Sequence, residues 1–109
     1  MALDLPEPLP RYFAAQNALD ADLMTACFAP DAVVRDEGGT YIGREAIRGW
    51  KRDTIAKYGI SIDPLSSAQQ DERTVVVAEV AGNFPGSPAK LTYAFGVSPD
   101  GLIRTLDIH

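Results

Sequence analysis

The fold is decided by residues 60–108, which read ISIDPLSSAQQDERTVVVAEVAGNFPGSPAKLTYAFGVSPDGLIRTLDI. Apolar and polar residues alternate through much of this stretch, and a period of two is typical of strands with one buried face. Acidic residues, proline and glycine interrupt the alternation where a chain can turn back. We therefore predict four strands joined by hairpins, which cover residues 60–70, 73–84, 89–98 and 102–108.

The chain before this stretch has a helical period instead. Apolar residues recur every three or four positions, and this spacing predicts helices. The three predicted helices cover residues 10–18, 20–28 and 44–58.

Residues with known capping roles support the ends of these helices. Asp4 and Glu7 have the spacing of a capping box ahead of the first helix, and Asp20 can cap the second. Gly59 follows the third helix where a left-handed backbone conformation is favoured. The second helix is expected to place Leu23, Met24, Cys27 and Phe28 on one apolar face and to end at residues 29–31.

A short β-branched run at residues 32–36 predicts one more strand, closed by a turn at Glu37-Gly38-Gly39 and followed by a short strand at 41–42. Helices that precede a meander of strands are the pattern of an α+β domain with the helices on one side of an antiparallel sheet. Gly82 and Gly96 lie inside the long predicted strands, so we expect this sheet to be strongly curved.

Length and composition limit the classes of function. The 109 residues form a single predicted domain, 1–109, with 15 acidic and 10 basic side chains and a net charge of −5. Without a basic stripe, no nucleic-acid partner is expected. Cys27 and His109 are the only residues of their types, so no metal site is expected. Without a leader or a long apolar run, we expect a cytoplasmic protein with no membrane partner.

Three segments of the sequence resemble the SnoaL-like and ketosteroid-isomerase-like branches of the nuclear transport factor 2-like superfamily. These segments are RYFAAQNALD at residues 11–20, FAPDAVVRD at 28–36 and IGREAI at 42–47. The resemblance covers nearly the whole chain. It implies an α+β fold in which a cone-shaped, curved antiparallel sheet wraps around the N-terminal helices and encloses a pocket.

The resemblance also implies roles for three residues. In ketosteroid isomerases, an aspartate at the end of the first strand moves a proton next to a carbonyl, and a tyrosine and a protonated acid bind the oxyanion. By position Asp36 matches the base and Tyr12 matches the tyrosine. Tyr93, a phenol in place of a carboxylic acid, falls at the third position. No cofactor is implied.

The alternation of the strands adds candidate pocket residues. Asp36 shares a face with the apolar Val34, which places Arg35 and Glu37 outside, and Arg104 shares a face with Leu106 and is expected to point inward or toward the pocket mouth. The expected ligand wall consists of Trp50, Phe28, Phe84, Phe95, Arg104 and Leu106. Simpler interpretations stay open: Asp36 can cap the turn or pair with an arginine, and the aromatic residues can be ordinary core.

Three functions are therefore considered. The first is a proton-transfer enzyme, an isomerase, cyclase or dehydratase, acting on a small apolar carbonyl compound. The second is a ligand-binding or assembly module without catalysis, and the third is an epoxide-type hydrolase that uses an Asp36–Arg104 pair. A homodimer is also expected, through an outer sheet face that carries Val76, Ala78 and Val80.

Overall fold

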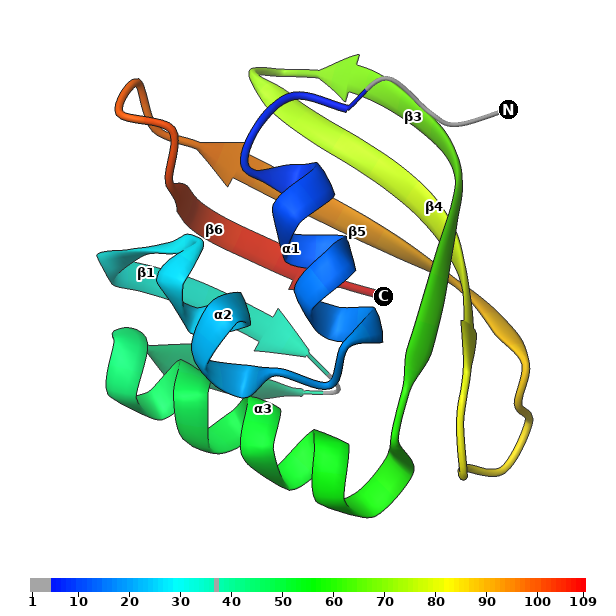
Figure 1. The fold of residues 1–109 in the computed structure, drawn as a ribbon. Coiled ribbons are helices and arrows are strands. Elements are labelled where there is room, and N and C mark those ends of the chain that lie inside the picture. Colours follow the sequence, from blue (N-terminus) through cyan, green and yellow to red (C-terminus); the bar gives the residue numbers. More distant parts are fainter. Residues whose placement is uncertain (1–4, 37) are drawn as a thin grey trace.

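The computed structural model describes residues 5–36 and 38–109, which form a six-stranded sheet and three helices (Figure 1). The predicted cap at Asp4 and the outward side chain of Glu37 lie outside the described residues. In chain order the elements are α1 Leu9–Asn17, α2 Ala21–Ala26, β1 Phe28–Asp36, β2 Gly39–Ile42, α3 Arg44–Tyr58, β3 Ser61–Gln70, β4 Arg73–Ala81, β5 Ala89–Val97 and β6 Ile103–Ile108.

The sheet is curved and open, with the strand order β2-β1-β6-β5-β4-β3, and the three helices lie on one side of it (Figure 1). The α+β class is thus as expected. The sheet is not wholly antiparallel, however, because β1 and β6 run parallel. Helix α3 carries the chain from the β2 edge to the β3 edge, and the meander then returns across the sheet until β6 reaches β1.

The second helix is shorter than predicted. The Asp20 side chain caps it as expected, accepting a hydrogen bond from the Leu23 amide at 3.0 Å. The helix ends at Ala26, and Phe28 already belongs to β1, where it pairs with Ile103. The expected apolar helix face is therefore wrong, and Leu23 is 55% exposed. Pairing with β6 determines the conformation of this segment more strongly than its apolar spacing does.

The faces of β4 are the reverse of those assumed for the homodimer. Val76, Ala78 and Val80 are buried in the core, so they do not form an outer surface. The half-buried Val75 and Val77 lie on the opposite face. Three consecutive valines make both faces apolar, so alternation alone could not distinguish them.

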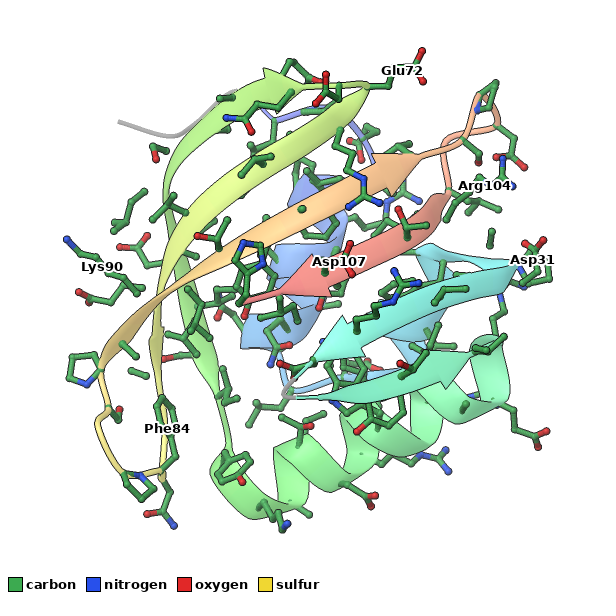
Figure 2. The ribbon with its side chains drawn as sticks, turned by 180° about the vertical axis from the view of Figure 1, so that it is seen from behind. Asp31, Glu72, Phe84, Lys90, Arg104 and Asp107 are labelled. Carbon is green, nitrogen blue, oxygen red and sulfur yellow. The ribbon has the colours of Figure 1, made fainter. Side chains whose placement is uncertain are left out.

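The outer face of the sheet also carries an ion-pair cluster. Figure 2 views the molecule from this side, with Asp107 on β6 in front of the helices. Asp107 binds Arg73 at 2.6 Å and Arg35 at 3.4 Å. The three side chains connect β1, β6 and β4 across the outside of the sheet.

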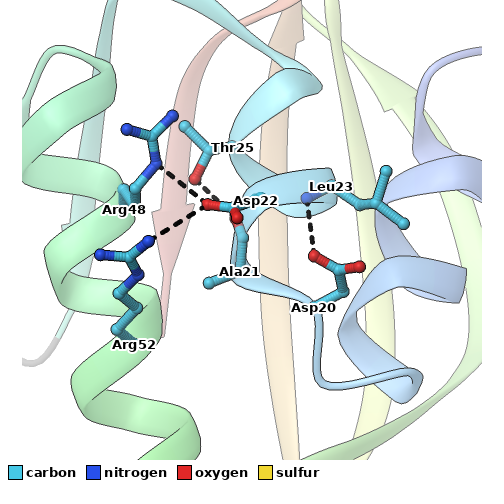
Figure 3. Close-up of polar contacts among 7 residues, drawn as sticks. All are labelled: Asp20, Ala21, Asp22, Leu23, Thr25, Arg48 and Arg52. Carbon is cyan, nitrogen blue, oxygen red and sulfur yellow. Dashed lines mark hydrogen bonds and ion pairs between the residues drawn. The ribbon is translucent and has the colours of Figure 1, made fainter.

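Helix α3 is held against α2 and presents one face to the sheet. Asp22 on α2 forms ion pairs with Arg48 at 3.2 Å and Arg52 at 3.5 Å (Figure 3). These exposed pairs contribute only about 0.2–1 kcal/mol each. The buried face of α3 consists of Ile47, Trp50 and Lys51. As predicted, α3 stops at Gly59, which has a φ of 55°.

Candidate functional site

A cavity of about 820 Å³ lies between α3 and the concave side of the sheet. Residues of two helices and of the sheet line it. They include Gln16 from α1, Trp50 and Lys51 from α3, and Asp36, Tyr93 and Ile108 from the strands. A cavity of this size can hold a small organic molecule. Its lining combines aromatic side chains with a comparable share of polar surface, to which Asp53, Thr54 and Lys57 also contribute, and this suits a guest with both an apolar part and polar groups.

The most unusual polar group of the cavity is Lys51, whose side chain is nearly fully buried. Its Nζ donates hydrogen bonds to Tyr12 Oη at 2.5 Å and to Gln16 Oε1 at 3.2 Å. It also lies 4.1 Å from the centre of the Trp50 ring, a cation–π contact. Burial lowers the pKa of the Lys51 amine to about 7, although the negative charge of Asp36 acts in the opposite direction.

Tyr12 lies behind Lys51 and does not belong to the cavity lining. It has no exposed surface, and its ring packs edge-on against Phe13, Phe28 and Phe95. Burial, with the nearby Tyr93 and Asp36, raises the pKa of its phenol well above the ordinary value. Tyr12 is therefore a neutral phenol that holds the Lys51 amine in place. It would not contact a guest directly and would affect the guest only by positioning Lys51.

Asp36 and Tyr93 both line the cavity, as the sequence predicted. Asp36 is the last residue of β1 and pairs with Ile108 on β6, and Ile108 pairs with Tyr93 on β5. The Cα atoms of Asp36 and Tyr93 are therefore two strand spacings apart, roughly 10 Å. Burial, and then the charge of Asp36, raises the pKa of Tyr93 above its ordinary value. The Tyr93 hydroxyl stays protonated and can donate a hydrogen bond.

The expected ligand wall is only partly correct. Trp50 and Phe84 line the cavity. Phe28, Phe95 and Leu106 have no exposed surface and belong to the core outside the cavity lining. They pack behind the wall, since the aromatic cluster around Tyr12 fills that part of the interior.

The inward orientation predicted for Arg104 is wrong. Arg104 is exposed, and Figure 2 shows it at the start of β6 beside the loop from β5. A register shift between Gly96 and Val97 breaks the alternation, so that Ile103 and Leu106 are both buried. Ile108, which is the residue paired with Asp36, lies four positions away from Arg104, about 13 Å along the strand. The Asp36–Arg104 pair does not form.

The family follows from the comparison with known proteins. A family model described as the SnoaL-like domain matches residues 9–103. The chain belongs to the SnoaL-like family. A proposed polyketide cyclase from Sinorhizobium meliloti is 40% identical, with a TM-score of 0.92 over 97% of this chain and 96% of that one. Among curated proteins, no match is found.

More distant structures share the fold of this SnoaL-like domain. One is a protein with a ketosteroid isomerase-like fold from Catenulispora acidiphila, in complex with trimethylamine, at 21% identity and a TM-score of 0.84 over 97% of this chain and 86% of that one. Another is a nuclear transport factor 2-like protein from Cytophaga hutchinsonii, at 10% identity and a TM-score of 0.79 over 100% and 93%. At these identities the likeness extends to the fold alone.

Sequence reasoning missed Lys51, the buried amine in the cavity of this SnoaL-like domain. The signal was present, because Lys51 lies four residues after Ile47 and four before Ile55, on the apolar face of the helix. A lysine at such a position is either an exposed residue at the edge of the stripe or a buried functional amine. Its hydrogen-bonding neighbour Gln16 is likewise a polar residue on the buried face of a helix, α1, and indicates the same polar site.

The described residues give no indication of a metal centre or a membrane span. In residues 5–36 and 38–109, no three His, Cys, Asp or Glu side chains lie together as a set of metal ligands. Within the same ranges, no helix has the length and apolar character needed to cross a bilayer.

Proposed function

We propose that this SnoaL-like domain is a cofactor-independent proton-transfer enzyme, an isomerase or cyclase, that acts on a small, largely apolar carbonyl compound. One observation carries the proposal: the carboxylate of Asp36 shares a cavity with the amine of Lys51 and the neutral phenol of Tyr93. This combines a proton acceptor with two hydrogen-bond donors, the set that formation of an enolate requires.

In the proposed reaction, Asp36 removes a proton from the carbon next to the carbonyl group. The electron pair of the broken C–H bond forms a C=C bond, and negative charge develops on the carbonyl oxygen. The Tyr93 hydroxyl and the Lys51 amine donate hydrogen bonds to that oxygen, while Tyr12 positions Lys51. Return of the proton at another carbon completes an isomerisation, and attack of the enolate carbon on a second carbonyl completes a cyclisation.

The similarity to the proposed polyketide cyclase favours this class, since that protein is 40% identical over almost the whole of both chains. The hydrolase is not carried forward, because Arg104 lies outside the cavity. The aromatic and aliphatic part of the cavity lining supports the expected partner, a small apolar molecule.

The test replaces Asp36 with asparagine, which keeps the shape of the side chain and removes the base. We expect Asp36→Asn to slow the exchange of the α-protons of 2-tetralone into deuterium oxide by about a hundredfold or more, followed by NMR. Asp31→Asn is the matched control, because Asp31 is an exposed carboxylate on the same strand. Equal exchange in the Asp36 variant would eliminate the proposed base.

The same experiment separates the enzyme from a binding module. If 2-tetralone raises the melting temperature of the protein in a saturable way but its α-protons do not exchange, the domain binds without catalysis. The homodimer and the cytoplasmic location also stay predictions, and the homodimer now depends on the face that carries Val75 and Val77.

A further inference from the structure

Lys51 is a buried charge of a kind that proteins rarely keep without a function. Only 3% of its surface is exposed. No other Asp, Glu, Lys, Arg or His side chain among the described residues is buried. Burying an ammonium group is costly unless the group is paired or can lose its proton. Its closest hydrogen-bonding partners, Tyr12 and Gln16, are neutral side chains.

The surroundings fix the position of the amine at the cavity wall. Tyr12 Oη is held in the aromatic core, and Gln16 is oriented by its own hydrogen bond to the Ile60 carbonyl at 3.2 Å. The aliphatic part of Lys51 belongs to α3, a regular helix of 15 residues. The nitrogen atom is thus presented to a guest from a rigid element, which is what a reaction at that atom would need.

The environment also supplies the reactive form of the amine. With the pKa of Lys51 lowered to about 7, about half of the amines are neutral at pH 7. An ordinary lysine is neutral in fewer than about one molecule in a thousand at that pH. Only the neutral amine has the lone pair that attacks a carbonyl carbon.

We infer that Lys51 forms a reversible imine with an aldehyde or ketone held in this cavity. The inference rests on the proposed function only for the class of ligand, a carbonyl compound. The geometry that supports it is a fixed amine and a carboxylate, that of Asp36, in the walls of one cavity large enough for the guest.

Imine formation begins when the neutral amine attacks the carbonyl carbon of the guest. The lone pair of Nζ forms the C–N bond, and the π electrons of the carbonyl group move to its oxygen. Asp36 takes a proton from the nitrogen and gives it to that oxygen, which yields a carbinolamine. A second proton, from solvent through Asp36, lets the hydroxyl group leave as water, and the nitrogen lone pair closes the C=N bond. One amine, one carbonyl and one proton thus give one iminium ion and one water.

The iminium ion would make the proton transfer easier. Its positive nitrogen draws electrons from the neighbouring carbon more strongly than a neutral carbonyl does. Asp36 could then remove the α-proton to give an enamine in place of an enolate. Lys51 would act by a covalent bond where the simpler mechanism uses a hydrogen bond.

The test is reductive capture at pH 7 with benzaldehyde as the probe and sodium cyanoborohydride as the reductant. The chain has three lysines, Lys51, Lys57 and Lys90. Lys90 is exposed and outside the cavity lining, so it is the control for unselective labelling in the same molecule. Lys57 is exposed but lines the same cavity, so it tests whether access to the guest is enough without burial of the amine. We expect a benzyl group on Lys51 in at least about tenfold excess over Lys57 and Lys90, located by fragmenting the proteolytic peptides in a mass spectrometer. In the Lys51→Met variant, the total benzyl labelling of lysines should fall to the amount found on Lys57 and Lys90.

Equal labelling of the three lysines in the natural chain, or labelling of the exposed two alone, would overturn the imine, and this outcome needs no variant that folds. Benzaldehyde has no proton on the carbon next to its carbonyl group, so capture does not depend on Asp36 as the base of the proposed reaction. Capture on Lys51 without exchange of 2-tetralone would leave the imine standing and remove the proton-transfer enzyme. Exchange without capture would do the reverse.

Discussion

The chemistry of the site depends on four side chains whose ionisation is set by their shared burial and by the charge of one of them, Asp36. Lys51 is desolvated by the helix and by the aromatic core, and Asp36 opposes part of that effect. The same burial keeps the phenols of Tyr12 and Tyr93 protonated. An amine that ionises near neutral pH therefore stands beside donors that do not ionise at all, an arrangement often found at functional sites.

The ionisation of Lys51 predicts a pH-dependent stability. The folded pKa of about 7 is below the ordinary lysine value of 10.5, so between these values the unfolded chain binds more protons and the free energy of unfolding rises with pH. Below pH 7 the full penalty applies, at most roughly 5 kcal/mol for a shift of this size. Lys51→Met lacks the penalty, so we expect its advantage over the natural chain to be largest near pH 6 and to shrink by several kcal/mol toward pH 10.

Urea unfolding of both proteins at several pH values measures this difference. Lost hydrogen bonds to Tyr12 and Gln16 add an offset that does not change with pH, so the slope is the decisive quantity. A difference that stays constant from pH 6 to pH 10 would contradict an ionising, buried Lys51.

Among the elements, α3 determines where the site lies. It supplies Trp50 and Lys51. Its last turn is fixed to the loop just after β4, since the Tyr58 carbonyl accepts a hydrogen bond from the Asn83 amide at 2.8 Å. Gly82 passes close by, and a Cβ atom at this position would lie 2.8 Å from the Tyr58 oxygen.

Two glycine substitutions test this junction. Gly82→Ala should destabilise the domain by about 1–3 kcal/mol, because the clash is with a backbone oxygen that cannot turn away. Gly49→Ala, inside α3 with nothing within 4 Å of the new atom, should stabilise it by about 0.5–1 kcal/mol. Thermal unfolding measures both, and equal melting temperatures in the two variants would show that α3 and β4 are not tightly joined there.

The sequence predicted those parts of the structure that depend on local pattern. Helix α3 with its stop at Gly59, the meander and the inward Asp36 and Tyr93 follow from spacing and from the family resemblance. The prediction for Arg104 was wrong, because a bulge shifts the alternation and no residue type in the sequence indicates that bulge. The helical prediction for Phe28 was wrong, because its conformation is determined by its strand partner Ile103, which lies 75 residues further along the chain.

At the scale of the whole molecule, the outer face of the sheet remains the expected contact between two copies. The half-buried Val75 and Val77 lie on it, beside the cluster of Asp107 with Arg35 and Arg73. We expect a dimer by analytical ultracentrifugation at micromolar concentration. Val77→Glu should shift the equilibrium toward monomer, since it would bury a charge in the contact. A monomer of the natural chain at that concentration would contradict the dimer.

The strand order also leaves β3 at an edge of the sheet, with ten residues whose second side has no strand beside it among the described elements. Such an edge can recruit a strand from another chain and start aggregation. Pro64 lacks an amide hydrogen, and the pairing shifts register between Pro64 and Ser66, so the edge is an uneven template. Serine and glutamine fill most of its later half. These features disfavour edge-to-edge pairing of β3 between copies of the chain. They leave the outer face of the sheet available for the expected dimer contact.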